Sequence, residues 1–148
     1  MNKLPSEGSS YVFEISKLVK DIKAVEVIYA PPFTGLFDLK VKPPFHIAAQ
    51  NCHWEDCGAF TGEISLQMIK DCGAEYVILG HSERRHIFNE TDEWVNNKVR
   101  AVLSNDLKPI LCIGETIKQR ENGDTKSILE NQLEKGLSSI EKINNCII

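Results

Sequence analysis

The chain has 148 residues, of which 42% are hydrophobic and 26% charged, and its formal net charge at pH 7 is −4. This length suits one domain with a sizeable core, so we expect a single domain over residues 1–148. The mildly acidic balance argues against nucleic acid or an anionic membrane surface as a partner. The sequence also contains no apolar run long enough to cross a bilayer and no secretory signal, so we expect a cytoplasmic protein.

The five cysteines are expected to be reduced thiols, because the chain has no secretory signal. Cys52, His53 and Cys57 could be taken for part of a metal site. They lack a fourth ligand at a recognisable spacing, so we predict no metal. Whether Cys112 or Cys57 has a regulatory use stays open.

The first half of the chain alternates between helical and extended patterns. A helix is expected from about residue 6 to 22, because Val12, Ile15, Leu18 and Val19 recur at helical spacing. The segments expected after it are a strand at 24–29, a brief helix at 33–39, a strand at 46–50, a long loop at 51–62 and a short helix at 64–71.

The second half begins with a short apolar strand that stops at Gly80. Thr91 is predicted to cap a helix on which Val95, Val99, Val102 and Leu103 form one apolar stripe. The segments expected after that helix are a strand at 108–113, a long helix at 125–143 and the beginning of another buried strand at 146–148.

This alternation indicates parallel strands joined by right-handed crossovers, and therefore an α/β fold. An open doubly wound sheet would also fit. We favour a barrel because polar side chains follow the strand ends at 50–51, 81–83 and 114–116. A doubly wound fold would more often carry a glycine-rich phosphate turn after its first strand, and the sequence has none.

His81 is the first candidate for a catalytic residue, because it comes directly after a buried strand and Gly80. Ser82 and Glu83 look like the start of a helical turn. The unpaired N–H groups of such a turn disfavour an imidazolium, so we expect a neutral His81 that donates a hydrogen bond. The alternative is that His81 only caps the turn. His46 is interpreted as a scaffold residue.

Four blocks of sequence resemble the triosephosphate isomerase family, in matching order and separation. They are Ala49-Gln50-Asn51, the segment 58–65 (GAFTGEIS), the segment 76–85 (YVILGHSERR) and the segment 109–116 (PILCIGET). The resemblance covers nearly the whole chain. It implies a partial (β/α)8 TIM barrel, roughly from helix 1 to the start of strand 6.

The resemblance also implies an activity. The family interconverts dihydroxyacetone phosphate and glyceraldehyde 3-phosphate, in glycolysis and gluconeogenesis, without cofactor or metal. It implies a triose phosphate as substrate and a homodimer for the complete protein. His81 and Glu83 match catalytic positions. We assign no substrate-binding residue within this chain. The residues that the resemblance places at the dimer interface are Gln50, Phe60, Thr61, Gly62, Glu63 and Arg84, with Glu63 and Arg84 pairing across it.

Some parts of the family pattern have no match in residues 1–148. These are the Asn-x-Lys of the first strand, the catalytic glutamate after the sixth strand and the glycine-rich phosphate loops. We therefore expect a truncated portion of the enzyme, inactive by itself because nothing accepts the substrate proton. The alternative is a non-catalytic half-barrel that binds a partner or acts as a scaffold.

Overall fold

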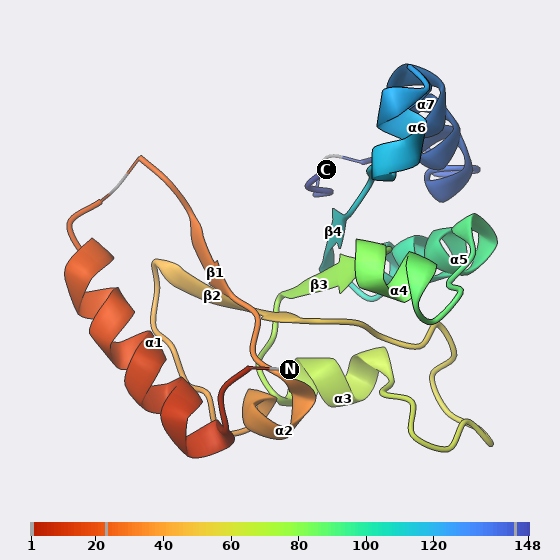
Figure 1. Ribbon diagram of the computed structural model, residues 1–148. Helices are drawn as coiled ribbons and strands as arrows, with labels where there is room; N and C mark the ends of the chain where they lie inside the picture. The colour runs from red at the N-terminus through yellow and green to blue at the C-terminus, as the bar shows by residue number, and fades with distance from the viewer. Residues whose placement is uncertain (1, 23, 144) are drawn as a thin grey trace. The chain divides into compact units, whose positions relative to one another are not determined.

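The computed structural model describes residues 2–22, 24–143 and 145–148 (Figure 1). The chain divides into two compact units, Met1–Val77 and Ile78–Ile148. The boundary between the units falls within one strand.

The first unit is built on parallel strands. Its elements are α1 (Pro5–Val19), β1 (Val27–Tyr29), α2 (Phe33–Leu36), β2 (Phe45–Ala49), α3 (Leu66–Asp71) and the first residues of β3 (Tyr76–Leu79). β1 pairs with β2 from Val27↔Phe45 onward, and β2 pairs with β3 at Ala48↔Tyr76. The middle of this sheet is closed to solvent, because Ala48, Ala49 and Val77 are all 0% exposed.

Helix α1 begins with Pro5, whose missing N–H costs nothing in a first helical turn. Glu7 accepts a hydrogen bond from the backbone N–H of Leu4 at 2.8 Å, which satisfies one of the unpaired donors there. Val12 is buried, but Leu18 is 77% exposed although helical spacing groups it with Val12, so the apolar face expected for this helix is not buried at Leu18. The first turns of α1 meet α2, where a Cβ on Gly35 would lie 3.6 Å from Cα of Pro5.

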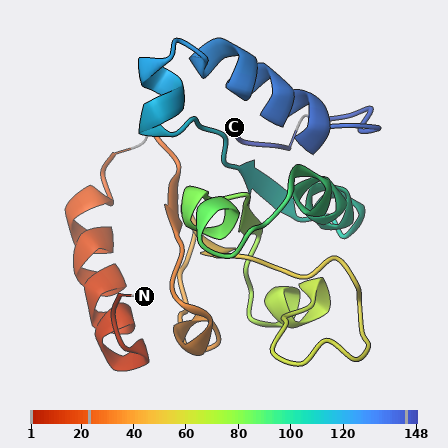
Figure 2. The same cartoon turned by 45° about the vertical axis from the view of Figure 1, so that its right-hand side comes forward.

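The second unit holds the rest of β3 and the helices that follow it. Its further elements are α4 (Ser82–His86), α5 (Asp92–Ser104), β4 (Lys108–Leu111), α6 (Ile117–Glu121) and α7 (Thr125–Gly136). Helix α5 packs against β4 and α7 (Figure 2). Its predicted cap is confirmed, because the Thr91 side chain accepts from the N–H of Trp94 at 3.2 Å. Its predicted stripe is confirmed for three of its four residues, since Val95, Val99 and Val102 are 0% exposed, whereas Leu103 is only partly buried.

The end of the chain differs from the sequence-based expectations in three ways. Helix α6 was not expected, although Thr116 and Gln119 form a capping box at its start. Helix α7 ends at Gly136, a residue that favours helix termination, rather than near residue 143. The segment 146–148 makes one parallel bridge, Ile110↔Ile147, and Ile147 is 40% exposed, so it is not a buried strand. Within the described residues, none of the helices is long and apolar enough to span a membrane.

Candidate functional site

The candidate site begins where β3 ends, at Gly80. This residue has φ +67°, a conformation that residues with a side chain rarely adopt. A Cβ at this position would lie 2.8 Å from Nη2 of Arg85 and 3.2 Å from the carbonyl oxygen of Cys112. Gly80 therefore lets the ends of β3 and β4 and the Arg85 side chain come close together.

His81 follows Gly80 and is the N-cap residue of α4. Its ring Nδ1 accepts a hydrogen bond from the backbone N–H of Glu83 at 3.3 Å. A ring nitrogen that accepts this bond carries no hydrogen, so in the neutral ring the hydrogen lies on Nε2. The capping role considered as the alternative for His81 is thus confirmed. It occupies Nδ1 only, so the Nε2–H of the neutral ring can still donate to a ligand.

Glu83 adds a carboxylate beside this ring. Its Oε2 lies 3.5 Å from Nδ1 of His81, and the Glu83 side chain is 72% exposed. Nδ1 cannot both donate to this carboxylate and accept from the Glu83 N–H. The bond from the Glu83 N–H is the shorter of the two, and it satisfies an otherwise unpaired donor in the first turn of α4. We therefore assign this bond as the one that fixes the orientation of the His81 ring.

Arg85 holds the surrounding backbone together, which the sequence did not predict. Its Nε donates to the carbonyl oxygen of Gly80 at 2.7 Å and its Nη2 donates to that of Cys112 at 3.4 Å. Its Nη1 donates to Oδ1 of Asp92, in the first turn of α5, at 2.5 Å. One partly buried guanidinium thus connects the ends of two strands with the start of a helix.

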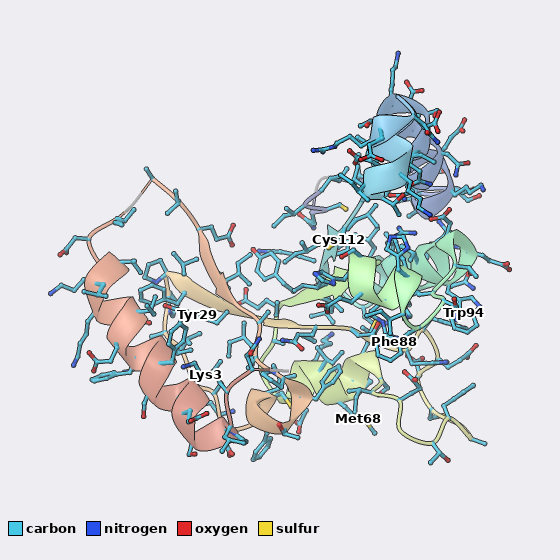
Figure 3. All side chains as sticks on the ribbon, in the orientation of Figure 1. Lys3, Tyr29, Met68, Phe88, Trp94 and Cys112 are labelled. Carbon is cyan, nitrogen blue, oxygen red and sulfur yellow. The ribbon has the colours of Figure 1, made fainter. Side chains whose placement is uncertain are left out.

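A pocket of about 250 Å³ lies at these strand ends. Its wall includes the segment that leaves β4, with Cys112 at its start (Figure 3). The residues that line it are Gly80, His81, Ser82, Arg85, His86, Cys112, Ile113, Gly114 and Glu115. The predicted residues after β3 and β4 therefore meet here in part. His81, Ser82, Gly114 and Glu115 line the pocket, whereas Glu83 and Thr116 do not.

Two titratable groups of this wall have shifted pKa values. The pKa of Glu115 is lowered, first by a backbone hydrogen bond and then by Arg120, whose Nε donates to Oε1 of Glu115 at 2.7 Å. The pKa of the Cys112 thiol is raised by burial, against a smaller opposite effect from Arg85. At neutral pH the wall thus carries a carboxylate and an uncharged thiol.

Arg84, predicted at the dimer interface, has partners within its own unit. Its Nε lies 3.3 Å from Oε1 of the buried Glu90, and its guanidinium lies 5.4 Å from the ring centre of Phe88. Glu90 is also paired with the buried Lys98. A buried charge pair of this kind is costly to break, so it holds Arg84 in a defined direction.

The other predicted interface residues lie in the first unit. Gln50 donates from Nε2 to the carbonyl oxygen of Ala30 at 2.8 Å, which joins the segments after β2 and β1. Phe60 is 43% exposed, and its ring centre lies 4.3 Å from that of His53. Thr61, Gly62 and Glu63 continue the same loop. Their role at an interface stays a prediction.

The described residues include no group of three or more His, Cys, Asp or Glu side chains arranged to hold a metal ion. The pocket offers the Nε2 side of the His81 ring, the Glu115 carboxylate and backbone groups at strand ends. Such a set can bind a small polar molecule and polarise a carbonyl oxygen.

Comparison with known proteins agrees with this arrangement. The sequence matches the family model described as triosephosphate isomerase over residues 1–148. It is 46% identical to triosephosphate isomerase of Carboxydothermus hydrogenoformans over 143 residues, which are 95% of this chain and 57% of that protein. It is 48% identical to the enzyme of Caldanaerobacter subterraneus subsp. tengcongensis over 145 residues, covering 96% of this chain and 58% of that one.

The fold is similar as well. The crystal structure of triosephosphate isomerase from Bartonella henselae matches with a TM-score of 0.91 and 34% sequence identity, covering 100% of this chain and 62% of that one. The predicted α/β class and partial TIM barrel are therefore confirmed. The chain spans a little under three fifths of the length of the two sequence relatives above. Over that span it belongs to the triosephosphate isomerase family.

Proposed function

We propose that the protein that contains this chain is a triosephosphate isomerase, which interconverts dihydroxyacetone phosphate and glyceraldehyde 3-phosphate in glycolysis and gluconeogenesis. The observation that carries the proposal is the bond from the Glu83 N–H to Nδ1 of His81, which leaves a hydrogen on Nε2. In this enzyme class a neutral histidine polarises the substrate carbonyl while a glutamate acts as the base.

In the proposed reaction, Nε2–H of His81 donates to the carbonyl oxygen of the substrate. As the base removes the neighbouring carbon-bound proton, negative charge develops on that oxygen, and the hydrogen bond strengthens. Glu83 keeps the ring in its direction through its backbone N–H. The ring then passes protons between the two oxygens of the enediolate.

The base itself is not assigned to any residue of this chain. Glu115 does not suit this role, because hydrogen bonds from the backbone, Arg120 and Thr125 lower the pKa of its carboxyl and make it a weak proton acceptor. We therefore expect no turnover from the 148-residue chain alone. Turnover by this chain that disappears in His81→Ala would contradict that expectation.

The assembly and location of the protein are part of the proposal. We propose a cytoplasmic homodimer that acts on a triose phosphate without cofactor or metal, and a single barrel domain to which residues 1–148 contribute. The interface is proposed to include Gln50, the loop from Phe60 to Glu63, and Arg84. The exposed Phe60 ring supports a contact at that loop.

A coupled assay with dihydroxyacetone phosphate tests the function. In the active enzyme, His81→Ala is expected to lower kcat by about 10²–10⁴-fold, with a smaller change in KM, because the lost bond acts on the transition state. His46→Gln is the control, since His46 does not line the pocket. A raised KM with unchanged kcat would show that His81 only binds substrate. A protein that binds a partner but never turns over would favour the scaffold alternative.

A further inference from the structure

We propose that Gln132 is a positioning residue for the His81 pocket, because its side-chain amide fixes the backbone of Gly114 in the pocket wall. The consequence for ligands rests on the proposed function. The effect of Gln132 on the Gly114 backbone is independent of that function. The backbone effect and the effect on ligands are therefore tested separately.

The contact is a two-point clamp between α7 and the segment that follows β4. Oε1 of Gln132 accepts from the N–H of Gly114 at 2.8 Å, and Nε2 donates to the carbonyl oxygen of Gly114 at 3.0 Å. One side chain therefore satisfies both backbone groups of one residue. The two partners also define which end of the amide is nitrogen.

Gly114 needs such a restraint, because the strand ladder has ended before it. β4 ends at Leu111, and the N–H of Cys112 donates to the carbonyl oxygen of Leu79 at 2.9 Å. A Cβ on Gly114 would meet no atom within 4 Å, so neighbouring atoms do not confine this residue. Glycine has the largest backbone freedom of all residues, and here the Gln132 amide limits it.

A second contact shows that α7 holds this wall at successive residues. Oγ1 of Thr125 donates to Oε1 of Glu115 at 3.2 Å. Thr125 and Gln132 are seven positions apart, which is two helical turns, so they lie on one face of α7. That face contacts Gly114 through Gln132 and Glu115 through Thr125, and both contacted residues line the pocket.

Loss of the clamp leaves the Gly114 N–H and carbonyl without these partners and free to turn. Polar groups that turn into or away from the pocket change its shape and the bonds it offers to a small phosphorylated ligand. The His81 ring is set by α4 and not by α7, so its Nδ1 contact is expected to stay. The proposed role is therefore to hold one wall in place while another element presents the reacting group.

Amide hydrogen exchange on the 148-residue chain tests the clamp. Gln132→Met keeps the length of the side chain but removes both hydrogen bonds. Exchange at the Gly114 amide, relative to its unstructured rate, is expected to become about tenfold faster or more. Asn131→Met, at an exposed neighbouring position on α7, is the matched control. It should change the exchange rate of the Gly114 amide less than twofold. Exchange at Val99, in the core of α5, reports global opening and should not change in either variant.

A second variant keeps the test decisive if Gln132→Met does not fold. In Gln132→Glu an ionised carboxylate cannot donate to the Gly114 carbonyl and is repelled by it, so the two-point contact is lost. Protection of Gly114 should be low while this carboxylate is ionised and should recover as the pH falls and it becomes protonated, because the acid can donate. Unchanged Gly114 exchange in both variants would overturn the clamp.

The link to function is tested in the active enzyme. Gln132→Met is expected to lower kcat/KM for dihydroxyacetone phosphate about tenfold without moving the pH profile, whereas Asn131→Met leaves it unchanged. Faster Gly114 exchange with unchanged kcat/KM would overturn the positioning role while the proposed function stands. A wild-type enzyme without isomerase activity would contradict the proposed function, and the exchange experiment would still decide whether the clamp exists.

Discussion

His46 in the first unit and His81 in the second lie at opposite ends of their strands, and their rings have opposite hydrogen-bond environments. His46 is near the start of β2, where Nδ1 lies 2.8 Å from Oε1 of Glu75 and Nε2 lies 3.3 Å from Oε1 of Glu26. His81 follows β3, where Nδ1 accepts from a backbone N–H. An ionised carboxylate only accepts, so Nδ1 of His46 carries a hydrogen and Nδ1 of His81 does not.

The difference shows how the fold assigns two roles to one residue type. The ring of His46 is flanked by Glu26, Glu75 and the edge-on ring of Tyr76, 5.6 Å away, and both of its nitrogens lie against carboxylates of the protein. The ring of His81 uses one nitrogen for the cap of α4 and keeps the other for a ligand. The first arrangement stabilises a unit, and the second prepares a reaction.

The largest expected effect on stability comes from a substitution at Gly80, at the end of the strand that precedes His81. Gly80→Ala forces a side chain into a left-handed conformation and against Nη2 of Arg85. We expect it to lower the free energy of unfolding by about 2–4 kcal/mol, measured by urea denaturation. Gly73→Ala is the control, because Gly73 has φ +84° with no atom within 4 Å of a Cβ, and about 1 kcal/mol is expected there. Equal losses of stability in the two variants would show that the contact with Arg85 adds nothing to the cost of Gly80→Ala.

A smaller effect is expected from His46. His46→Ala removes the bond to Glu75 and leaves two carboxylates without the ring between them. We expect a loss of about 1 kcal/mol in the free energy of unfolding, since the ring is partly exposed. His46→Gln, which can still donate to Glu75, should recover part of it. If His46→Ala were neutral, the scaffold role of this histidine would be wrong.

The smallest effect is expected from Glu115, and it depends on pH. Its pKa is lowered in the folded protein by a backbone hydrogen bond and by Arg120. The stabilisation is therefore complete above the ordinary glutamate pKa of about 4.3 and is lost as the pH falls through the lower folded value. The difference in stability between wild type and Glu115→Gln should thus shrink below about pH 4. A difference that grows on acidification would contradict the assigned shift.

The sequence predicted those features that depend on residues close together in the chain. Thr91 as a cap, the stripe of α5 and His81 beyond a buried strand all follow from local patterns. Glu115 and Ser82 also lie in the pocket, as expected from strand ends that meet at one edge. Helix α6 had a local signal too, the capping box that begins at Thr116.

The features that the sequence did not predict depend on contacts between residues far apart in the chain. Arg85 reaches Cys112, 27 positions away, and Gln132 reaches Gly114, 18 positions away, and no local pattern marks either contact. Lys98 would be placed on the solvent side of α5 by its charge, yet it is 3% exposed because Glu90 pairs with it. Leu18 would be placed in the core by its hydrophobicity, yet α1 leaves it exposed.

The most direct test of the account is the position of the ring hydrogen on His81, read from two-bond ¹⁵N–¹H correlations at neutral pH. We predict that Nδ1 of His81 is unprotonated and Nε2 protonated, whereas Nδ1 of His46 is protonated. In His81→Gln the signals assigned to His81 disappear and those of His46 stay, which fixes the assignment. A His81 ring with a hydrogen on Nδ1 at neutral pH would contradict the proposed donor and the function built on it.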